Sequence, residues 1–244
     1  SGAPQVRAYI VRECCQAPSN FRCEGTLASY LKAQNVIGLC GVDTRALTRA
    51  IRENGVMNGI ITDSKTLTPA QQALLDSYEV RGAVQAVTTP EVRRYEAEGA
   101  QKHRVALWDF GTKRSLIQAL RQRGCQVTVW PAGSTAVEIL ADEPEGIVLS
   151  EGPGDPAAEP ALTHQIAQLC QAKRPVLGVG LGHELLALSQ GAKTYRLKHG
   201  HRGANQPVKD LATGRVRATS QNHGYAVDSE SVQAPGRVCL VKVN

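Results

Sequence analysis

The chain has 244 residues, a formal net charge of +6 and 42% hydrophobic residues, an ordinary content for a protein with a packed core. Its apolar runs are far shorter than the roughly 20 residues of a membrane helix, and its start lacks a signal-peptide pattern, so a cytoplasmic location without membrane contact is expected. Dispersed basic residues and only 4% aromatic residues disfavour a nucleic-acid partner. A solvated surface or an acidic protein partner accounts better for the charge.

The seven cysteines are odd in number and show no C-x-x-C spacing. This pattern indicates neither a disulfide framework nor a zinc site. We therefore expect reduced thiols and no metal site.

The amino-terminal part, residues 24–62, alternates helix, strand, helix and strand. Residues 26–31 have helical spacing, and residues 36–39 form a short apolar strand. Asp43 is the predicted N-cap of the second helix, which Gly55 ends before a second strand. These elements predict a compact α/β unit.

A polar stretch at residues 88–103 has little apolar periodicity. We predict a linker there, between a first domain at 1–87, whose last helix opens at Thr68-Pro69, and a second domain at 104–244. The first residue is not Met, and residues 237–244 have the pattern of a strand in mid-sheet. Both domains are therefore expected to be incomplete parts of a longer polypeptide.

The second domain alternates strands with helices. Strands are predicted at 104–111, 126–130, 146–149 and 175–179, and helices at 115–123, 136–141 and 162–172. Apolar strands that alternate with helices predict a mostly parallel, doubly wound sheet with helices on both faces. The reactive loops of such a sheet follow the carboxyl ends of its strands. Short strands are predicted from Thr194 onward.

Residues 175–184 have the outline of a nucleophile elbow, in which a strand turns sharply into a helix. Glycines permit strained dihedral angles there, and the backbone N–H of Leu181 would donate to an oxyanion at the helix start. Gly180 stands at the centre, where the nucleophile belongs. Taken alone, residues 178–182 equally fit a structural turn, and a dinucleotide fingerprint fits worse because the spacing is G-x-G-x-G.

The elbow is accompanied by several other segments in a characteristic order. They are SNFR at 19–22, SYL at 29–31, GVDTRALTR at 41–49, SEGPGDP at 150–156, KHGHRGANQPV at 198–208 and SQNHGYAVD at 220–228. Together with the elbow they resemble the small, glutamine-hydrolysing subunit of carbamoyl-phosphate synthetase, a class I glutamine amidotransferase family. The resemblance covers nearly the whole chain.

This resemblance implies hydrolysis of glutamine to glutamate and ammonia, and transfer of the ammonia to a large subunit that makes carbamoyl phosphate for pyrimidine and arginine synthesis. No cofactor is expected in this chain, because ATP and Mg²⁺ are expected on the large subunit. The family carries Cys at the position of Gly180 and takes its catalytic His and Glu from a segment that would follow Asn244. The chain is therefore expected not to hydrolyse glutamine, and the alternative is a non-catalytic pseudo-glutaminase that supports an ammonia-using synthetase.

The resemblance also implies a set of glutamine-binding positions. They are Gly152, Gly154, Leu181, Glu184, Asn222, Gly224 and Tyr225. Glu184 stands where the family has Gln, which replaces an amide donor by a negative charge and predicts weaker glutamine binding. His223 belongs to a substrate-contact loop that also carries Asn222, Gly224 and Tyr225, and it is not expected to be the catalytic base.

The remaining polar residues of this region are given no chemical role. His183 and His201 are predicted to be structural or surface histidines. The polar run that contains His199, His201, Arg202, Asn205 and Gln206 is too dense for a core strand, and either loop structure or hydrogen bonding near the site is expected of it.

Overall fold

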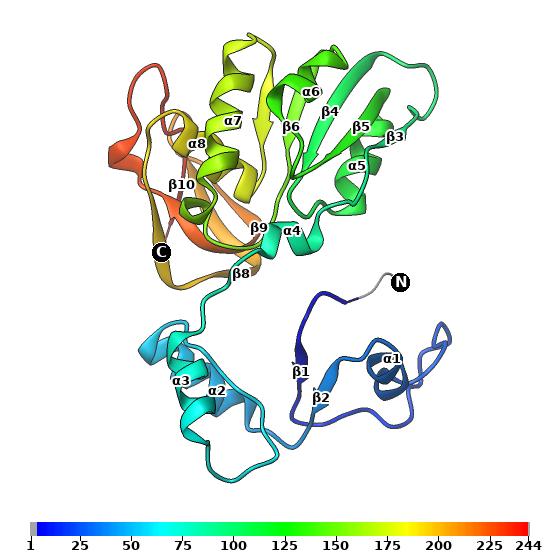
Figure 1. The fold of residues 1–244 in the computed structure, drawn as a ribbon, viewed down its shortest axis with the longest axis vertical. Coiled ribbons are helices and arrows are strands. Elements are labelled where there is room, and N and C mark those ends of the chain that lie inside the picture. Colours follow the sequence, from blue (N-terminus) through cyan, green and yellow to red (C-terminus); the bar gives the residue numbers. More distant parts are fainter. Residues whose placement is uncertain (1–3, 244) are drawn as a thin grey trace. The chain divides into compact units, whose positions relative to one another are not determined.

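The structure is a computed structural model that describes residues 4–243 (Figure 1). The chain divides into two compact units, Ser1–Lys65 and Thr66–Asn244. This division lies before the linker that we predicted at 88–103. Among the described residues, no helix has the length and apolar character needed to cross a membrane.

The first unit is built on two short parallel strands. Its elements are β1 (Ala8–Ile10), α1 (Leu27–Ala33), β2 (Ile37–Leu39) and α2 (Thr44–Asn54). Asp43 caps α2 by accepting hydrogen bonds from the backbone N–H groups of Arg45 and Ala46, and Gly55 ends the helix with a φ of 89°. Residues 56–62, which the structure describes, form no strand, and β2 pairs instead with β1, which the sequence pattern did not reveal.

The second unit contains the remaining elements. In chain order they are α3 (Pro69–Ser77), α4 (Ala83–Val87), β3 (Arg93–Tyr95), β4 (His103–Asp109), α5 (Arg114–Arg121), β5 (Cys125–Pro131), α6 (Ala136–Ala141), β6 (Gly146–Leu149), η1 (Pro156–Ala158), α7 (Pro160–Gln171), β7 (Val176–Gly178), α8 (Leu181–Ser189), β8 (Thr194–Asp210), β9 (Val216–Val227), η2 (Ser229–Ser231) and β10 (Leu240–Lys242). The helix predicted at Thr68-Pro69 is α3, and it belongs to this unit.

The main sheet of the second unit has the strand order β3-β5-β4-β6-β7 (Figure 1). The strands from β5 to β7 are parallel and β3 is antiparallel, so the prediction of a mostly parallel sheet is confirmed. Trp108 and Leu149 pack with α6, α7 and α8 on one face, whereas Leu107 and Val148 pack with α5 on the other. This alternation follows from the two-residue side-chain period of a strand and gives the sheet a core on both faces.

The strand order reverses beside β4. The chain passes from β4 to β5 on one side and then to β6 on the other. In open α/β sheets, ligands bind outside the carboxyl ends of the strands at such a reversal. The loops that follow β4, β6 and β7 are therefore the place to look for a site.

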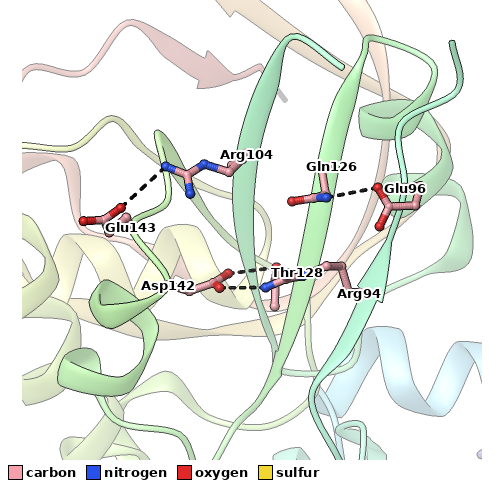
Figure 2. Close-up of polar contacts among 7 residues, drawn as sticks. All are labelled: Arg94, Glu96, Arg104, Gln126, Thr128, Asp142 and Glu143. Atoms are coloured by element: carbon pink, nitrogen blue, oxygen red, sulfur yellow. Dashed lines mark hydrogen bonds and ion pairs between the residues drawn. The ribbon is translucent and has the colours of Figure 1, made fainter. Parts of the chain in front are cut away.

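The predicted linker is part of the main sheet. Strand β3 pairs with β5, and Thr88 donates a hydrogen bond to the carbonyl oxygen of Asp109 at 2.6 Å. Figure 2 shows that one carboxylate anchors the strand: Asp142 accepts from Arg94 at 2.7 Å and from Thr128 at 3.0 Å. Arg93 and Arg94 are exposed in this edge strand, so its polar sequence concealed it.

A second sheet with the order β10-β8-β9 follows the elbow. We predicted short strands and a loop over the polar run, but β8 has 17 residues and β9 has 12. Residues 197–200 of β8 lie opposite Gly224 alone, so the strand bulges there. The polar side chains of the run are exposed or half-buried, so a dense polar run can remain in a strand. Strand β10 lies at the sheet edge rather than in mid-sheet, and Asn244 is outside the described residues.

Helix α6 begins with a capping box that provides a direct test of the fold. The backbone N–H of Glu138 donates to Thr135 Oγ1 at 3.3 Å, and the backbone N–H of Thr135 donates to Glu138 Oε2 at 2.7 Å. We expect Thr135→Ala to lower the free energy of unfolding of the second unit by about 1 kcal/mol, measured by urea denaturation. Thr135→Ser should retain most of the stability, and equal losses for both variants would contradict the capping role.

Candidate functional site

The predicted elbow is a sharp turn between β7 and α8. Gly180 is the N-cap of α8, with φ of 54° and ψ of −119°, a conformation that L-residues rarely adopt. The backbone N–H of Val179 donates to the carbonyl of Leu149 at 2.9 Å, and that of Gly182 to the carbonyl of Ser150 at 3.0 Å. These bonds hold the turn against the carboxyl end of β6.

The three glycines of the turn differ in the space around them. A Cβ atom at Gly178 would lie 2.6 Å from Cα of His183, and one at Gly182 would overlap the carbonyl group of Leu149. At Gly180 the nearest atom would be Cβ of Glu151, at 3.2 Å. Packing therefore requires the outer glycines, whereas the central position has room for a side chain despite its strained dihedral angles.

Two backbone donors near the turn come from different segments of the chain. The N–H of Leu181, in the first turn of α8, and that of Gly152, in the loop after β6, have no hydrogen-bond partner within residues 4–243. A Cβ atom at Gly152 would overlap the carbonyl oxygen of Phe110, so only glycine brings this loop so close to β4. Gly154, with φ of 99°, continues the loop. Such free N–H groups at a helix start favour a negatively charged ligand atom.

Glu184 lies one turn along α8 from Gly180 and is 6% exposed. The helix N-terminus would stabilise its ionised form by about 0.3–1 kcal/mol. Burial and then the negative charge of Asp155 instead raise its pKa from 4.5 to about 7. That change corresponds to about 3 kcal/mol, so desolvation decides the state of this group.

Strand β9 closes the site on a further side. Helix α8 contacts both β9 and η1. Burial and the charge of Asp155 raise the pKa of Tyr225, and the charge of Glu184 contributes to this shift. The structure thus brings Glu184 and Tyr225 together with the loop that carries Gly152 and Gly154.

Two further predicted glutamine-binding positions, Gly224 and Asn222, also lie on β9, and the structure relates them to the elbow less directly. Gly224 lies opposite the bulge of β8, where a Cβ atom would approach the guanidinium of Arg202 at 3.4 Å. Asn222 is exposed and pairs with Arg202 in the strand register. Both belong to a strand rather than to the loop that we expected.

Two histidines form a pair across β8 and β9. Nδ1 of His201 lies 3.0 Å from Nε2 of His223, and the rings are nearly perpendicular. Nδ1 of His223 contacts the carbonyl oxygen of Tyr225, which can only accept, so Nδ1 must carry a proton. Burial and the charge of Lys242 lower the pKa of His201. This pair joins β8 to β9 two residues from Tyr225. His183 lies on α8, where partial burial and then the charge of His223 lower its pKa.

The sequence did not single out two carboxylates of the loop after β6. Asp155 caps η1 by accepting from the N–H of Ala157 at 2.9 Å, and it influences both Glu184 and Tyr225. Glu151 lies against Gly180, with Oε1 accepting from the N–H of Lys113 and Oε2 buried without a partner. The sequence signal that could have identified these two carboxylates is that they follow a buried strand. Within the described part of the chain, no group of three or more His, Cys, Asp or Glu residues is arranged to hold a metal ion.

Comparisons with known proteins agree with the two-part organisation. The profile "Carbamoyl-phosphate synthase small chain, CPSase domain" matches residues 1–61, and "Glutamine amidotransferase class-I" matches residues 106–244. A solved glutamine amidotransferase from Thermotoga maritima is 20% identical with a TM-score of 0.44, and the match covers 52% of this chain and 62% of that chain.

Relatives of known sequence match almost all of the chain. The carbamoyl phosphate synthase small chain of Clostridium perfringens is 48% identical over 93% of this chain and 64% of its own length. That of Symbiobacterium thermophilum is 44% identical over 100% of this chain and 69% of its own length. The chain thus spans about two thirds of the length of these relatives. It belongs to the carbamoyl-phosphate synthase small chain family of class I glutamine amidotransferases.

Proposed function

We propose that this chain binds L-glutamine at the elbow as part of a carbamoyl-phosphate synthase small chain but does not hydrolyse it. The observation that carries the proposal is Gly180, the one glycine of the turn with room for a side chain and the position at which the family carries its cysteine. A nucleophile elbow presents its reactive atom from such a strained centre. Glycine has no side chain and therefore no nucleophilic atom at this position.

Hydrolysis of an unactivated amide needs a nucleophile, a base and donors for the negative oxygen of the tetrahedral intermediate. The N–H groups of Leu181 and Gly152 would serve as those donors. Gly180 cannot form a thioester, so the covalent route is closed. Loss of the nucleophile in a comparable catalytic triad lowers turnover by a factor on the order of 10⁶.

Glutamine would be held by the positions that the resemblance assigns to it. Backbone N–H groups at Gly152, Gly154 and Leu181 suit its negatively charged or carbonyl oxygens. Glu184 borders the same site from α8 and Tyr225 borders it from β9. Asn222 and Gly224 complete the proposed set on β9.

The names of the relatives support a large-chain partner, since each is described as a small chain. In this proposal the large chain holds ATP and Mg²⁺ and makes carbamoyl phosphate for the pyrimidine and arginine pathways, in the cytoplasm. The small chain described here would leave it dependent on free ammonia.

The alternative is a pseudo-glutaminase that supports the large chain without binding glutamine. Gly180 supports this alternative as well as it supports the first proposal, because both proposals exclude hydrolysis. Binding of labelled L-glutamine to the chain separates them, since only the first proposal expects it.

The test of the shared claim is a synthesis assay of the complex with a large chain. Ammonium should support carbamoyl phosphate formation, and glutamine alone should not. Formation of glutamate from glutamine at a rate near that of a cysteine-containing relative would overturn the proposal.

A further inference from the structure

Three polar side chains form a row on β9. Thr219, Gln221 and His223 are two residues apart, so the side-chain period of a strand places them on one face. All three are half-buried. Strand β8 lies opposite, with Gln206 paired to Thr219 and His201 paired to His223. Hydrogen bonds join the row from one end to the other.

The direction of these hydrogen bonds is set at the Thr219 end of the row. The hydroxyl of Thr219 donates its one proton to the carbonyl oxygen of Gln206 at 2.9 Å. Oγ1 of Thr219 can then only accept, and it accepts from Nε2 of Gln221 at 2.9 Å. The amide oxygen of Gln221 therefore points along the row, where Oε1 lies 3.0 Å from Nε2 of His223.

The other end of the row is set by a backbone carbonyl group. Nδ1 of His223 contacts the carbonyl oxygen of Tyr225, so Nδ1 carries a proton. Nε2 of His223 faces the amide oxygen of Gln221, which also can only accept. A second proton, on Nε2, satisfies both contacts and makes His223 an imidazolium ion. A neutral His223 would instead direct the lone pair of Nε2 at the lone pairs of the amide oxygen.

His201 fits this assignment as a neutral partner. Its Nδ1 lies 3.0 Å from Nε2 of His223, and this contact requires one proton between the two nitrogens. With that proton on His223, Nδ1 of His201 accepts. Burial and then the charges of Lys242 and His223 lower the pKa of His201, and the opposing effect of Gln221 is smaller. His201 is therefore the member of the pair that stays neutral.

The charged and titratable groups that act on the pair or lie beside it are basic. They are His199 and Arg202 of β8, Lys242 of β10 and His183 of α8. Among the described residues, no carboxylate contributes to the pKa shift of His201 or of His183. The imidazolium is instead held by its three acceptors, because a hydrogen bond from an ionised donor is stronger than one from a neutral donor.

We propose that Thr219 and Gln221 are positioning residues, which hold His223 as the imidazolium ion and so place a positive charge on β9 between Asn222 and Gly224. The charge of His223 also reaches the first turn of α8, where it lowers the pKa of His183 after the larger effect of burial. A positive charge in this place favours a ligand group that is negatively charged. The charge would be present whether or not glutamine binds, so it goes beyond the proposed glutamine site.

The experiment is ¹⁵N NMR at pH 7 of the chain labelled in its histidine rings. The ring nitrogens distinguish the imidazolium ion from each neutral tautomer. Loss of signals in His223→Asn identifies those of His223, and loss in His201→Asn identifies those of His201. His223 should be mostly imidazolium, and His201 should be neutral with its proton on Nε2. A mostly neutral His223, or a proton on Nδ1 of His201, overturns the proposal.

Thr219→Val tests the role of the row directly. Thr219 is four residues from His223, and Gln221 lies between them. Valine keeps the shape of threonine but removes its acceptor, so the amide of Gln221 can rotate and turn its NH₂ group toward Nε2 of His223. The ratio of imidazolium to neutral His223 should then fall about tenfold, the change expected for loss of one hydrogen bond from a charged group.

Thr219→Ser is the matched control, because serine retains the hydroxyl group and should retain the ratio of the parent. Gln221→Met removes the acceptor itself and should lower the ratio at least as much as Thr219→Val. An unchanged ratio in Thr219→Val or Gln221→Met would overturn the positioning role. Equal falls in Thr219→Val and Thr219→Ser would overturn it as well, because the hydroxyl group would then not be the cause.

Discussion

Gly180→Cys should acquire a thiol at residue 180 that reacts with a chloromethyl ketone analogue of glutamine, whereas the parent chain has no reactive atom there. The nearest atom to a new Cβ is Cβ of Glu151 at 3.2 Å, so the side chain fits with a small adjustment. A thiol at the start of a helix has a lowered pKa and reacts as the thiolate. Peptide-resolved mass spectrometry measures the modification, and L-glutamine should protect the residue.

The control for this experiment is Gln190→Cys, which places an exposed thiol at the other end of α8. Exposed native cysteines such as Cys15 and Cys23 supply the background rate within the same sample. Equal labelling at residues 180 and 190, without protection by glutamine, would mean that the turn does not border an amino-acid site. Where the catalytic His and Glu are also present, the same substitution should raise glutamine hydrolysis by a factor on the order of 10⁶.

Glu184→Gln should stabilise the second unit at neutral and alkaline pH and leave it unchanged in acid. The folded state holds the pKa of Glu184 at about 7, against 4.5 for the unfolded chain. Between these values the folded state binds more protons than the unfolded state, so the free energy of unfolding falls as the pH rises. The full loss is about 3 kcal/mol, and Gln avoids it because an amide does not ionise.

Urea denaturation at pH 4.5 and pH 8, followed by tryptophan fluorescence, measures this effect. Both tryptophans, Trp108 and Trp130, lie in the second unit, so the signal reports that unit alone. Glu138→Gln is the matched control, because hydrogen bonds from Thr135 lower the pKa of Glu138. Its loss of stability should appear at pH 8 and fade in acid. A Glu184→Gln gain of equal size at both pH values would exclude titration of Glu184 as the cause.

The elements that the sequence predicted well are those specified by local signals. Helices α2 and α6 have caps at Asp43 and Thr135, and β6 is a short apolar run between turns. Strand β3 depends on Asp142, which is 48 residues from Arg94 in the chain. The length of the β8–β9 hairpin depends on register, which no local pattern fixes.

The features of the site that could be predicted are likewise those determined by neighbouring residues, and the features that could not are determined by residues distant in the sequence. Glycine spacing was sufficient to locate the turn at Gly180, because the chain needs glycines for so sharp a change of direction. The influence of Asp155 on Glu184 arises only when the loop after β6 reaches α8. The contact between His201 and His223 likewise requires the bulged pairing of β8 with β9. Neither relation is encoded by neighbouring residues.

The unequal crowding of the three turn glycines means that packing constrains residues 178 and 182 more than the residue at the centre of the turn. Packing against His183 and Leu149 would select for glycine at 178 and 182 whether or not any catalysis occurs, while a Cβ atom at residue 180 would meet a milder contact, 3.2 Å from Cβ of Glu151. A change at residue 180 therefore need not alter the surrounding architecture. The residue at the centre of the turn and the backbone shape of the turn can thus vary independently of one another.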